Sequence, residues 1–421
     1  MNHVVASFLS APALHDASCP ACGGHVAATF FDGGLKPLAT IAWPESPEEA
    51  RGMPQLPNDF VRCVACGHVF NKAFTYHAVP YAKKPNLMFN EGANWSGFIR
   101  EVREHLLGSL PANPTVVEVG YGDGTFLAAL AESRPEGRYI GFDPNGATAP
   151  VGSQLELRAE LFDPRTHISE IQPDLIVMRH VLEHLTSSLA FLQLIAAASA
   201  LANLQPMAYC EVPCIDRVLT SGRTVDFYYE HNSQFTTESF TTMLERSGGQ
   251  IHEVGHGYDG EVLYGLVKLR AHSGWAERAH AAAQFEASAQ GGLAAIKAQL
   301  QTLASSGSRV AIWGGTGKSA AFIQRYDLDA QRFPLVVDSD RNKADTYVPG
   351  TGQRIQFRDV LHHEPVDVLI IPPQWRARDI LEEMRRNGIH VGKVLIEHQG
   401  SLIDFHRDAH PYWGAIELAA A

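Results

Sequence analysis

The sequence lacks any apolar run close to the ~20 residues that a membrane-spanning helix needs. Its first residues, MNHVVASFLSAPALHDASCP, also lack the charged segment followed by a long apolar segment that is typical of a signal peptide. Basic residues are in deficit, since 34 Lys and Arg stand against 46 Asp and Glu and the formal net charge is −12. A phosphate backbone attracts positive charge, so a nucleic-acid partner is not expected. We expect a soluble cytoplasmic protein without a membrane partner.

Cysteine is scarce, with six in 421 residues, and four of the six form two CxxC pairs. The other two, Cys210 and Cys214, lie in the segment YCEVPC. This usage is typical of a cytosolic metal site and not of a disulfide framework. Hydrophobic residues make up 45% and charged residues 19% of the chain, which excludes a disordered or fibrous protein. The length predicts two or three domains.

The two CxxC pairs predict a structural zinc site. They are CPAC and CVAC, and each is followed by a glycine that can adopt the positive φ of a metal-binding turn. Two-residue spacing lets both thiolates reach one ion, and four thiolates close a tetrahedral site. One redox pair beside a coincidental second pair is the alternative. The predicted ligands are Cys19, Cys22, Cys63 and Cys66.

A glycine turn in TVVEVGYGDGTFLAALAESRP predicts a cofactor cradle between a strand and a helix. Asp143 follows the next predicted strand about twenty residues later, where a carboxylate can accept both ribose hydroxyls. The order E-x-G-x-G-x-G lacks the glycine spacing of a dinucleotide site, and Glu118 suits a cationic methionine better than phosphates. The predicted cofactor is therefore S-adenosylmethionine.

Two further strand ends complete the predicted cofactor site. The segment LELRAELFDP places Glu160, Leu161 and Phe162 where an adenine would lie, and PDLIVMRHVLEHL runs from a buried strand into a polar turn. This order is that of a class I methyltransferase, and an α/β sheet without a cofactor is the alternative. The predicted cofactor-binding residues are Glu118, Gly120, Tyr121, Gly122, Gly124, Asp143, Pro144, Glu160, Leu161, Phe162 and His180.

The segment DFYYEHNSQFTTESF, residues 226–240, follows the apolar strand MAYCEVPC and precedes a predicted helix. By succession along a doubly wound sheet, its polar side chains lie beside the carboxyl ends of the strands, where the cofactor binds. A histidine with a pKa near neutrality can accept a proton there, and a carboxylate can orient its ring. Upstream, the irregular segment after the second CxxC pair carries Tyr76 and Tyr81, which are either walls of a site or packing residues.

With these parts the chain resembles the bacterial sugar C-methyltransferases that act on nucleoside-diphosphate 4-keto-deoxysugars. The resemblance covers nearly the whole chain and rests on the four-cysteine module, the methyltransferase core, the motif YYEH and a C-terminal domain carrying VVDSDRNKADTYVPGTG. It implies a SAM-dependent (S-adenosylmethionine-dependent) C-methylation through α-deprotonation and enolate attack on the methyl group. The implied base is His231. Its implied partners are Glu230 as orienter or sugar ligand, Tyr228 and His184 as polar stabilisers, and Tyr81, or else Tyr76, as the substrate-site tyrosine.

The last third contains a second glycine turn, in SRVAIWGGTGKSAAFIQRY. The first glycine of a phosphate-binding P-loop is missing, whereas Gly315, Gly317 and Ala320 satisfy GxGxxA and Asp338 follows about twenty residues later. A dinucleotide site, and with it an NAD-dependent oxidoreductase, therefore stays open. O- or N-methylation of a small metabolite and a non-catalytic binding protein are further alternatives. The resemblance instead implies that Lys318 contacts the diphosphate of a nucleotide sugar.

We expect an α/β protein of three modules. A zinc-binding module with a substrate-site segment covers residues 1–93, a class I (Rossmann-like) methyltransferase domain covers 94–272, and a bridging helix with a C-terminal Rossmann-like domain covers 273–421. The bridge is alanine-rich and helical in pattern apart from its paired glycines at 291 and 292. The expected partner is a small-molecule substrate, a nucleoside-diphosphate sugar.

Overall fold

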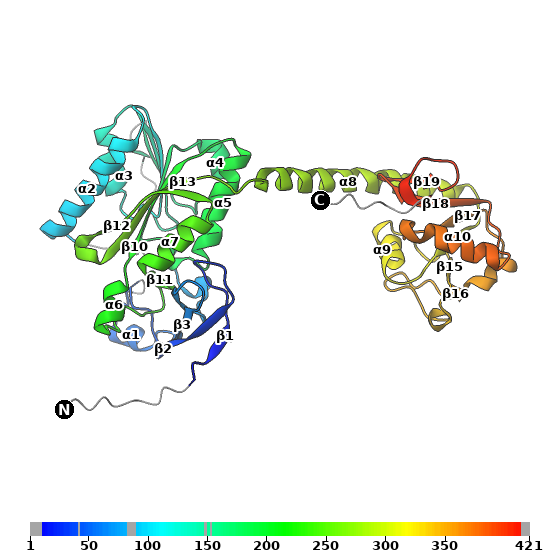
Figure 1. Ribbon diagram of the computed structural model, residues 1–421, viewed down its shortest axis with the longest axis horizontal. Helices are drawn as coiled ribbons and strands as arrows, with labels where there is room; N and C mark the ends of the chain where they lie inside the picture. The colour runs from blue at the N-terminus through cyan, green and yellow to red at the C-terminus, as the bar shows by residue number, and fades with distance from the viewer. Residues whose placement is uncertain (1–10, 41–42, 82–89, 147–149, 152–153, 414–421) are drawn as a thin grey trace. The chain divides into compact units, whose positions relative to one another are not determined.

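The computed structural model describes residues 11–40, 43–81, 90–146, 150–151 and 154–413. The chain divides into two compact units, Met1–Ala276 and Glu277–Ala421 (Figure 1). Within the described residues, no helix is both long and apolar enough to cross a membrane.

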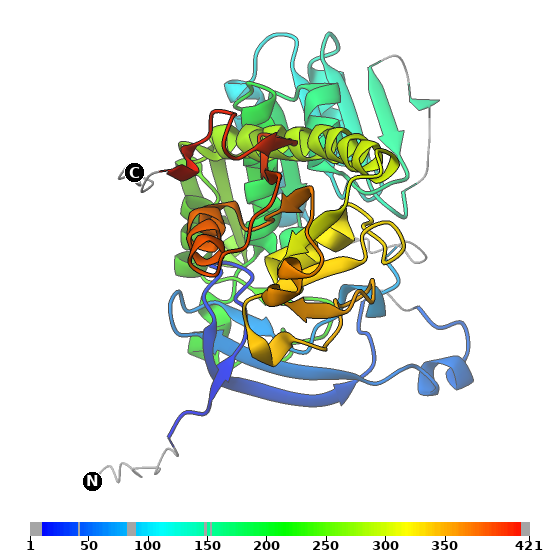
Figure 2. The same cartoon turned by 90° about the vertical axis from the view of Figure 1, so that its right-hand side faces the viewer.

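An antiparallel sheet of the order β1-β2-β3-β4-β11 forms the N-terminal part of the first unit, and β2 and β3 are its long blue strands in Figure 2. The elements are β1 (Leu14–Asp16), β2 (Val26–Lys36), α1 (Pro47–Arg51), β3 (Leu56–Cys63), β4 (Val69–Asn71) and β11 (Ser233–Gln234). Strand β11 comes from far along the sequence, since Ser233 pairs with Phe70 and Gln234 with Val69. The segment 226–240 is therefore tied to the cysteine module.

A second sheet has the order β12-β13-β10-β9-β5-β6-β8-β7. Its strands are β5 (Thr115–Val119), β6 (Arg138–Phe142), β7 (Pro150–Val151), β8 (Leu155–Arg158), β9 (Leu175–Arg179), β10 (Met207–Pro213), β12 (Gly249–Gly257) and β13 (Val262–Leu269). The strands from β8 to β10 run parallel, while β13 lies antiparallel between β10 and β12. This arrangement confirms the predicted class I methyltransferase fold.

Helices cover both faces of this sheet, which is why its central strands are continuously apolar. Helices α2 (Ala93–Ser109) and α3 (Thr125–Ser133) pack on one face, and α4 (Pro164–Ile171), α5 (Ser188–Leu201) and α7 (Thr237–Arg246) pack on the other (Figure 1). The short helix α6 (Asp216–Ser221) follows β10. The buried cysteines of the N-terminal module belong to the same core cluster as α5 and α7. The module and the methyltransferase sheet therefore share one core.

The second unit contains a sheet of the order β16-β15-β14-β17-β18-β19, parallel except for β19. Its elements are α8 (Trp275–Ser305), which spans the boundary between the units, β14 (Val310–Trp313), α9 (Lys318–Arg325), β15 (Leu335–Asp338), β16 (Ile355–Phe357), β17 (Val368–Ile370), α10 (Ala377–Arg386), β18 (Lys393–His398) and β19 (Ser401–Asp404). The alternation of parallel strands and helices confirms the predicted Rossmann-like domain.

Helix α8 corrects one expectation, because the paired glycines do not interrupt it. Gly291 has open space around its Cα, but a Cβ on Gly292 would lie 2.7 Å from the Cα of Gly400. The second glycine is therefore required by close backbone packing within the unit and does not mark a helix break.

Candidate active site

The four predicted metal-binding cysteines come together. All four are buried, and their sulfur atoms lie within 4.8 Å of one another. The Cys19 and Cys66 sulfurs are 3.8 Å apart, and those of Cys22 and Cys63 are 3.6 Å apart. Four buried thiols at these separations match the donor set of a closed tetrahedral zinc site.

The backbone around these cysteines has the expected turn geometry. Gly23 and Gly67 adopt φ values of +72° and +71°, which confirms the reason for a glycine after each CxxC pair. The N–H of Gly24 donates to the Cys22 sulfur and the N–H of Ala65 to the Cys63 sulfur, each at 3.4 Å. These N–H groups stabilise thiolate charge, so the turns are arranged for a metal ligand.

The glycine turn after β5 forms the predicted cradle. Gly120 has φ of +73°, and a Cβ there would lie 2.5 Å from the side chain of Val181. Gly122 and Gly124 also adopt positive φ, and Gly124 precedes the first residue of α3. Only glycine leaves this backbone open to close approach by a ligand, so the turn fits the cofactor of a class I methyltransferase.

Asp143 lies at the end of β6, as predicted. Its carboxylate accepts the N–H of Gly122 at 3.1 Å and the N–H of Asn145 at 2.9 Å. It therefore links the glycine turn to the loop after β6. The adjacent Pro144 is half-buried, and Tyr121 is buried beneath the same loop.

The predicted adenine residues differ from one another in position. Leu161 is 59% exposed and Glu160 is also exposed, so both are open to a ligand. Phe162 is buried, and its ring lies 5.1 Å from that of Phe142 and 6.5 Å from that of Phe191. The structure thus uses Phe162 in the core, where it supports the strand end.

Buried charges lie at the ends of the central strands. Glu118 is buried at the end of β5, and burial raises its pKa to about 8 despite the opposing charge of Arg179. Glu211 in β10 is fully buried, and its carboxylate is 3.2 Å from Arg179 Nε and accepts the Tyr209 hydroxyl at 2.9 Å. We did not predict Glu211 as a site residue, although a lone acid inside the apolar segment MAYCEVPC was a visible signal.

His180 lies between two buried carboxylates. Its Nδ1 is 3.3 Å from Glu183 Oε1, and its Nε2 is 3.2 Å from Glu211 Oε1. Burial alone would lower the pKa of His180, but the two carboxylates outweigh burial and raise it to about 9. The residue also adopts φ of +53°, an uncommon conformation for a histidine. His180 is therefore a charged link between β9 and β10 next to the predicted cofactor site.

The predicted catalytic residues Tyr228, His231 and His184 are brought together. The Tyr228 hydroxyl is 2.8 Å from His231 Nε2, and the ring centroids of His184 and His231 are 4.9 Å apart. Burial lowers the pKa of His231 to about 3, and the His184 ring acts in the same direction. His231 is therefore neutral at physiological pH, and its pKa lies well below the near-neutral value that we expected for this histidine.

Glu183 is a further member of this cluster. It is buried, and one of its carboxylate oxygens lies within 4.8 Å of a ring nitrogen of His184 and of His231. Burial alone would raise the pKa of Glu183, but His180, His184 and His231 outweigh burial and lower it. The cluster therefore contains a buried negative charge that favours a proton on the imidazole rings.

Glu230 ties segment 226–240 to the N-terminal module. It is fully buried, and its Oε1 accepts the N–H groups of Ala39 and Thr40, each at 2.7 Å. The His231 ring lies 2.8 Å from the Tyr228 hydroxyl. Through Oε1, Glu230 fixes a loop of the N-terminal module against segment 226–240, because a buried carboxylate oxygen accepts two backbone donors there. Its expected role as orienter of His231 or as a sugar ligand stays a prediction.

Tyr81 and Tyr76 both reach the site. The Tyr81 hydroxyl is 3.1 Å from His184 Nδ1, and the Tyr76 and Tyr81 rings stack at 5.0 Å. Burial raises the pKa of Tyr76, and the nearby charge of Asp143 acts in the same direction. The stacked pair therefore extends from the histidine cluster toward the carboxylate at the end of β6.

In the second unit, Lys318 is exposed at the first position of α9. Its Nζ lies 5.2 Å from the centre of the Trp375 ring, and Trp375 is itself 56% exposed. Asp338, which would hold the ribose of a dinucleotide, is 3.3 Å from Lys343 Nζ instead. Ser319 donates to the Trp313 carbonyl and is structural.

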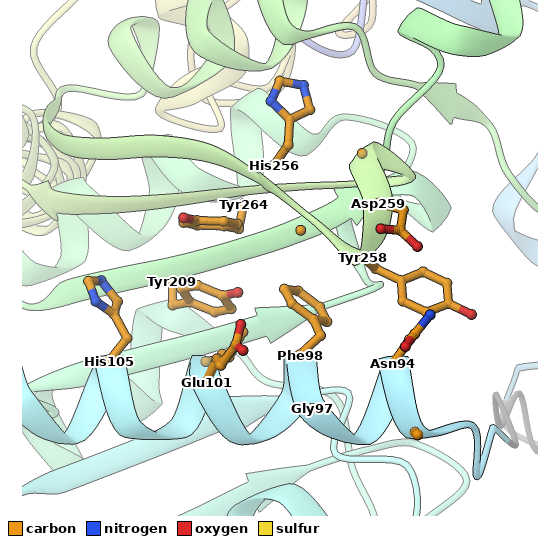
Figure 3. Close-up of a pocket in the computed structure, with 14 residues that line it drawn as sticks. Asn94, Gly97, Phe98, Glu101, His105, Tyr209, His256, Tyr258, Asp259 and Tyr264 are labelled. Carbon is orange, nitrogen blue, oxygen red and sulfur yellow. The ribbon is translucent and has the colours of Figure 1, made fainter.

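A cavity of about 630 Å³ lies between α2, β13 and the turn η3 (Tyr258–Gly260). Figure 3 shows the rings of Phe98, Tyr209 and Tyr264 along it. Its lining, all within the described chain, includes none of the predicted catalytic or cofactor residues. Trp95 contacts both Tyr258, which lines the cavity, and His180 of the charged cluster. We therefore base the site on the strand ends and not on this cavity.

Comparison with known proteins identifies the class. Residues 92–254 match the family model of a methyltransferase domain, and residues 264–397 match that of a C-methyltransferase C-terminal domain. The chain is thus a SAM-dependent methyltransferase with a C-methyltransferase C-terminal domain.

The individual relatives are either low in sequence identity or matched over a short stretch. A stretch of 47 residues is 47% identical to the tRNA (guanine-N(7)-)-methyltransferase of Hydrogenovibrio crunogenus and covers 11% of this chain and 19% of that protein. The magnesium protoporphyrin IX methyltransferase of Synechocystis PCC 6803 is 15% identical, with 42% of this chain and 84% of that chain covered and a TM-score of 0.31. A SAM-dependent methyltransferase of Aquifex aeolicus is 13% identical, with 43% and 100% covered and a TM-score of 0.30. These likenesses do not bear on substrate or residue roles.

Proposed function

We propose that this methyltransferase transfers a methyl group to a carbon next to the ketone of a nucleoside-diphosphate 4-ketosugar, a small-molecule substrate. The observation that supports this most is the cluster of Tyr228, His231 and His184, in a chain that also matches a C-methyltransferase C-terminal domain. A neutral histidine beside hydroxyl groups is suited to removing a proton α to a ketone.

The glycine turn and Asp143 would hold S-adenosylmethionine, which supplies an electrophilic methyl group carried on a sulfonium. The turn needs glycine at Gly120, because φ is +73° there and a Cβ would lie 2.5 Å from the Val181 side chain. Asp143 accepts the ribose hydroxyls while its bonds to Gly122 and Asn145 hold the carboxylate in place. The exposed Leu161 and Glu160 contact the adenine.

His231 is the base in this proposal. It takes the α-proton, and the electron pair of the broken C–H bond becomes the enolate. The enolate carbon would then bond to the methyl carbon as the methyl–sulfur bond breaks, with S-adenosylhomocysteine as the leaving group. A free pKa of about 3 keeps the ring neutral but makes it a weak acceptor. The buried Glu183 carboxylate, within 4.8 Å, stabilises the imidazolium as the proton arrives. Solvent then removes the proton.

The hydroxyl groups of Tyr228 and Tyr81 and the His184 ring stabilise the enolate oxygen as charge develops. Tyr76 forms the wall between the sugar and Asp143. In the second unit, taken by itself, we propose that Lys318 and the exposed Trp375 ring beside it form a binding surface for the diphosphate and base of a nucleotide.

A zinc ion held by Cys19, Cys22, Cys63 and Cys66 supports this site from a distance. Strand β4 follows the second cysteine pair and pairs with β11, which directly follows His231 and Asn232. The metal would therefore hold β4 in place, and through its pairing with β11 it would position His231.

The test is solvent exchange of the sugar proton. TDP-4-keto-6-deoxyglucose is incubated in heavy water with the protein and S-adenosylhomocysteine, and proton NMR follows the C3 signal. We expect exchange above the rate without protein, its loss in His231→Ala, and no change in His252→Ala, which removes an exposed histidine of β12. Absence of exchange with the unmodified protein would contradict C-methylation of this sugar and point to an oxygen or nitrogen acceptor.

A further inference from the structure

A second group of metal-binding side chains lies outside the active site. Cys214 follows β10, Asp216 begins α6 and His256 lies near the end of β12. One ligand atom of each lies within 4.8 Å of the other two. The catalytic proposal uses none of them, and neither does the four-cysteine site.

A hydroxyl group connects two members of this group. The Thr237 hydroxyl, in the first turn of α7, donates to Asp216 Oδ2 at 2.5 Å and is 3.0 Å from His256 Nε2. His256 Nε2 and Asp216 Oδ2 are themselves 3.8 Å apart. In Figure 3 the His256 ring points away from α2 and away from the rings of Phe98, Tyr209 and Tyr264 along the cavity. Three elements thus direct their polar atoms to one point.

The backbone at Cys214 repeats a feature of the four-cysteine site. Burial raises the pKa of the Cys214 thiol to about 11, and the backbone N–H of Asp216 acts in the opposite direction. In the four-cysteine site, Cys22 and Cys63 each accept the N–H of the residue two positions later. Cys214 thus has a backbone N–H at the same offset, although its sequence context, YCEVPC, has no CxxC pair.

We propose that Cys214, Asp216 and His256 bind one divalent cation of the zinc class, with water as the fourth ligand. Sulfur, imidazole nitrogen and carboxylate oxygen are the three donor types that zinc accepts in proteins. A thiolate, a carboxylate and a neutral imidazole neutralise the ion's two positive charges. Glu261, the nearby acid, is paired with Arg223 at 2.6 Å, and Arg223 also pairs with Asp226 at 2.7 Å. The ion would join the ends of β10 and β12 to the start of α6.

The experiment compares zinc content between the unmodified chain and His256→Ala. His256 is exposed, so its removal leaves the core intact, whereas replacement of the buried Cys214 could disturb folding. Each full-length protein is equilibrated by dialysis against buffered free zinc, and zinc per chain is measured by mass spectrometry. His252→Ala, an exposed histidine of the same strand, is the matched control.

We expect His256→Ala to hold one zinc ion fewer per chain than both the unmodified protein and His252→Ala. Asp216→Asn should show the same loss. Cobalt substitution gives a second measurement, since the thiolate-to-cobalt absorbance should fall in His256→Ala while that of the four-cysteine site is retained. Equal zinc content in the unmodified protein and His256→Ala, or an equal loss in His252→Ala, would overturn the proposal.

Discussion

At the scale of single residues, Asp143 combines two functions in one carboxylate. It orders the glycine turn through the N–H of Gly122 and is placed to accept ribose hydroxyls. We expect Asp143→Ala to weaken S-adenosylmethionine binding by about 1 to 3 kcal/mol, because hydroxyl groups of the ligand lose their acceptor. Isothermal titration calorimetry measures the change. Glu136→Ala, which removes an exposed acid before the other end of β6, should bind normally. If Asp143→Ala bound S-adenosylmethionine with unchanged affinity, the placement of Asp143 at the ribose would be refuted.

His180 makes stability depend on pH. Its folded pKa of about 9 lies above the ordinary value of 6.5, so its contribution is fully present below pH 6.5 and is lost as pH rises through about 9. The contribution is at most about 3 kcal/mol. We expect the melting temperature to fall over this window. His180→Asn tolerates the positive φ but leaves Glu183 and Glu211 without a cation, so it should be less stable at pH 6.5 and should lose this pH dependence. If the melting temperature of His180→Asn depended on pH in the same way as that of the unmodified protein, this account of His180 would be wrong.

At the scale of elements, α8 contains two adjacent glycines with opposite requirements. A Cβ on Gly292 would meet the backbone of Gly400, whereas nothing lies within 4 Å of a Cβ on Gly291. Gly292→Ala should destabilise the second unit by about 1 to 3 kcal/mol through overpacking. Gly291→Ala should stabilise it by up to about 1 kcal/mol, the difference in helix propensity. Urea unfolding followed by circular dichroism distinguishes the two, and similar effects of both would show that the Gly400 contact is absent.

At the scale of the whole molecule, the two units have separate cores. The clusters within Met1–Ala276 include the four cysteines, and those within Glu277–Ala421 do not. We expect two unfolding transitions in calorimetry. A strong chelator, or Cys63→Ser, should lower the temperature of the first transition only, since the proposed metal site lies in one unit. Loss of the metal should also abolish proton exchange on the ketosugar, because β4 holds β11 beside His231. A parallel shift of both transitions would contradict the division.

The parts of this protein that the sequence by itself determined are local. The glycines after each CxxC pair, the glycine turn at Gly120 and the carboxylate at Asp143 follow from backbone sterics and strand succession, and the fold confirms their geometry. The class I and Rossmann-like sheets follow from alternating strand and helix patterns in the same way.

Only the tertiary structure decided which polar groups meet. Glu230 bonds to Thr40 across 190 positions of sequence, and Tyr81 reaches His184 across 103. The pairing of β11 with β4, which places His231, is equally remote in sequence. The carboxylate of Glu230, next to His231 in sequence, accepts two N–H groups from residues about 190 positions away. Local sequence encodes conformational preference, whereas the partner of a buried charge depends on which chain segments the shared core brings into contact.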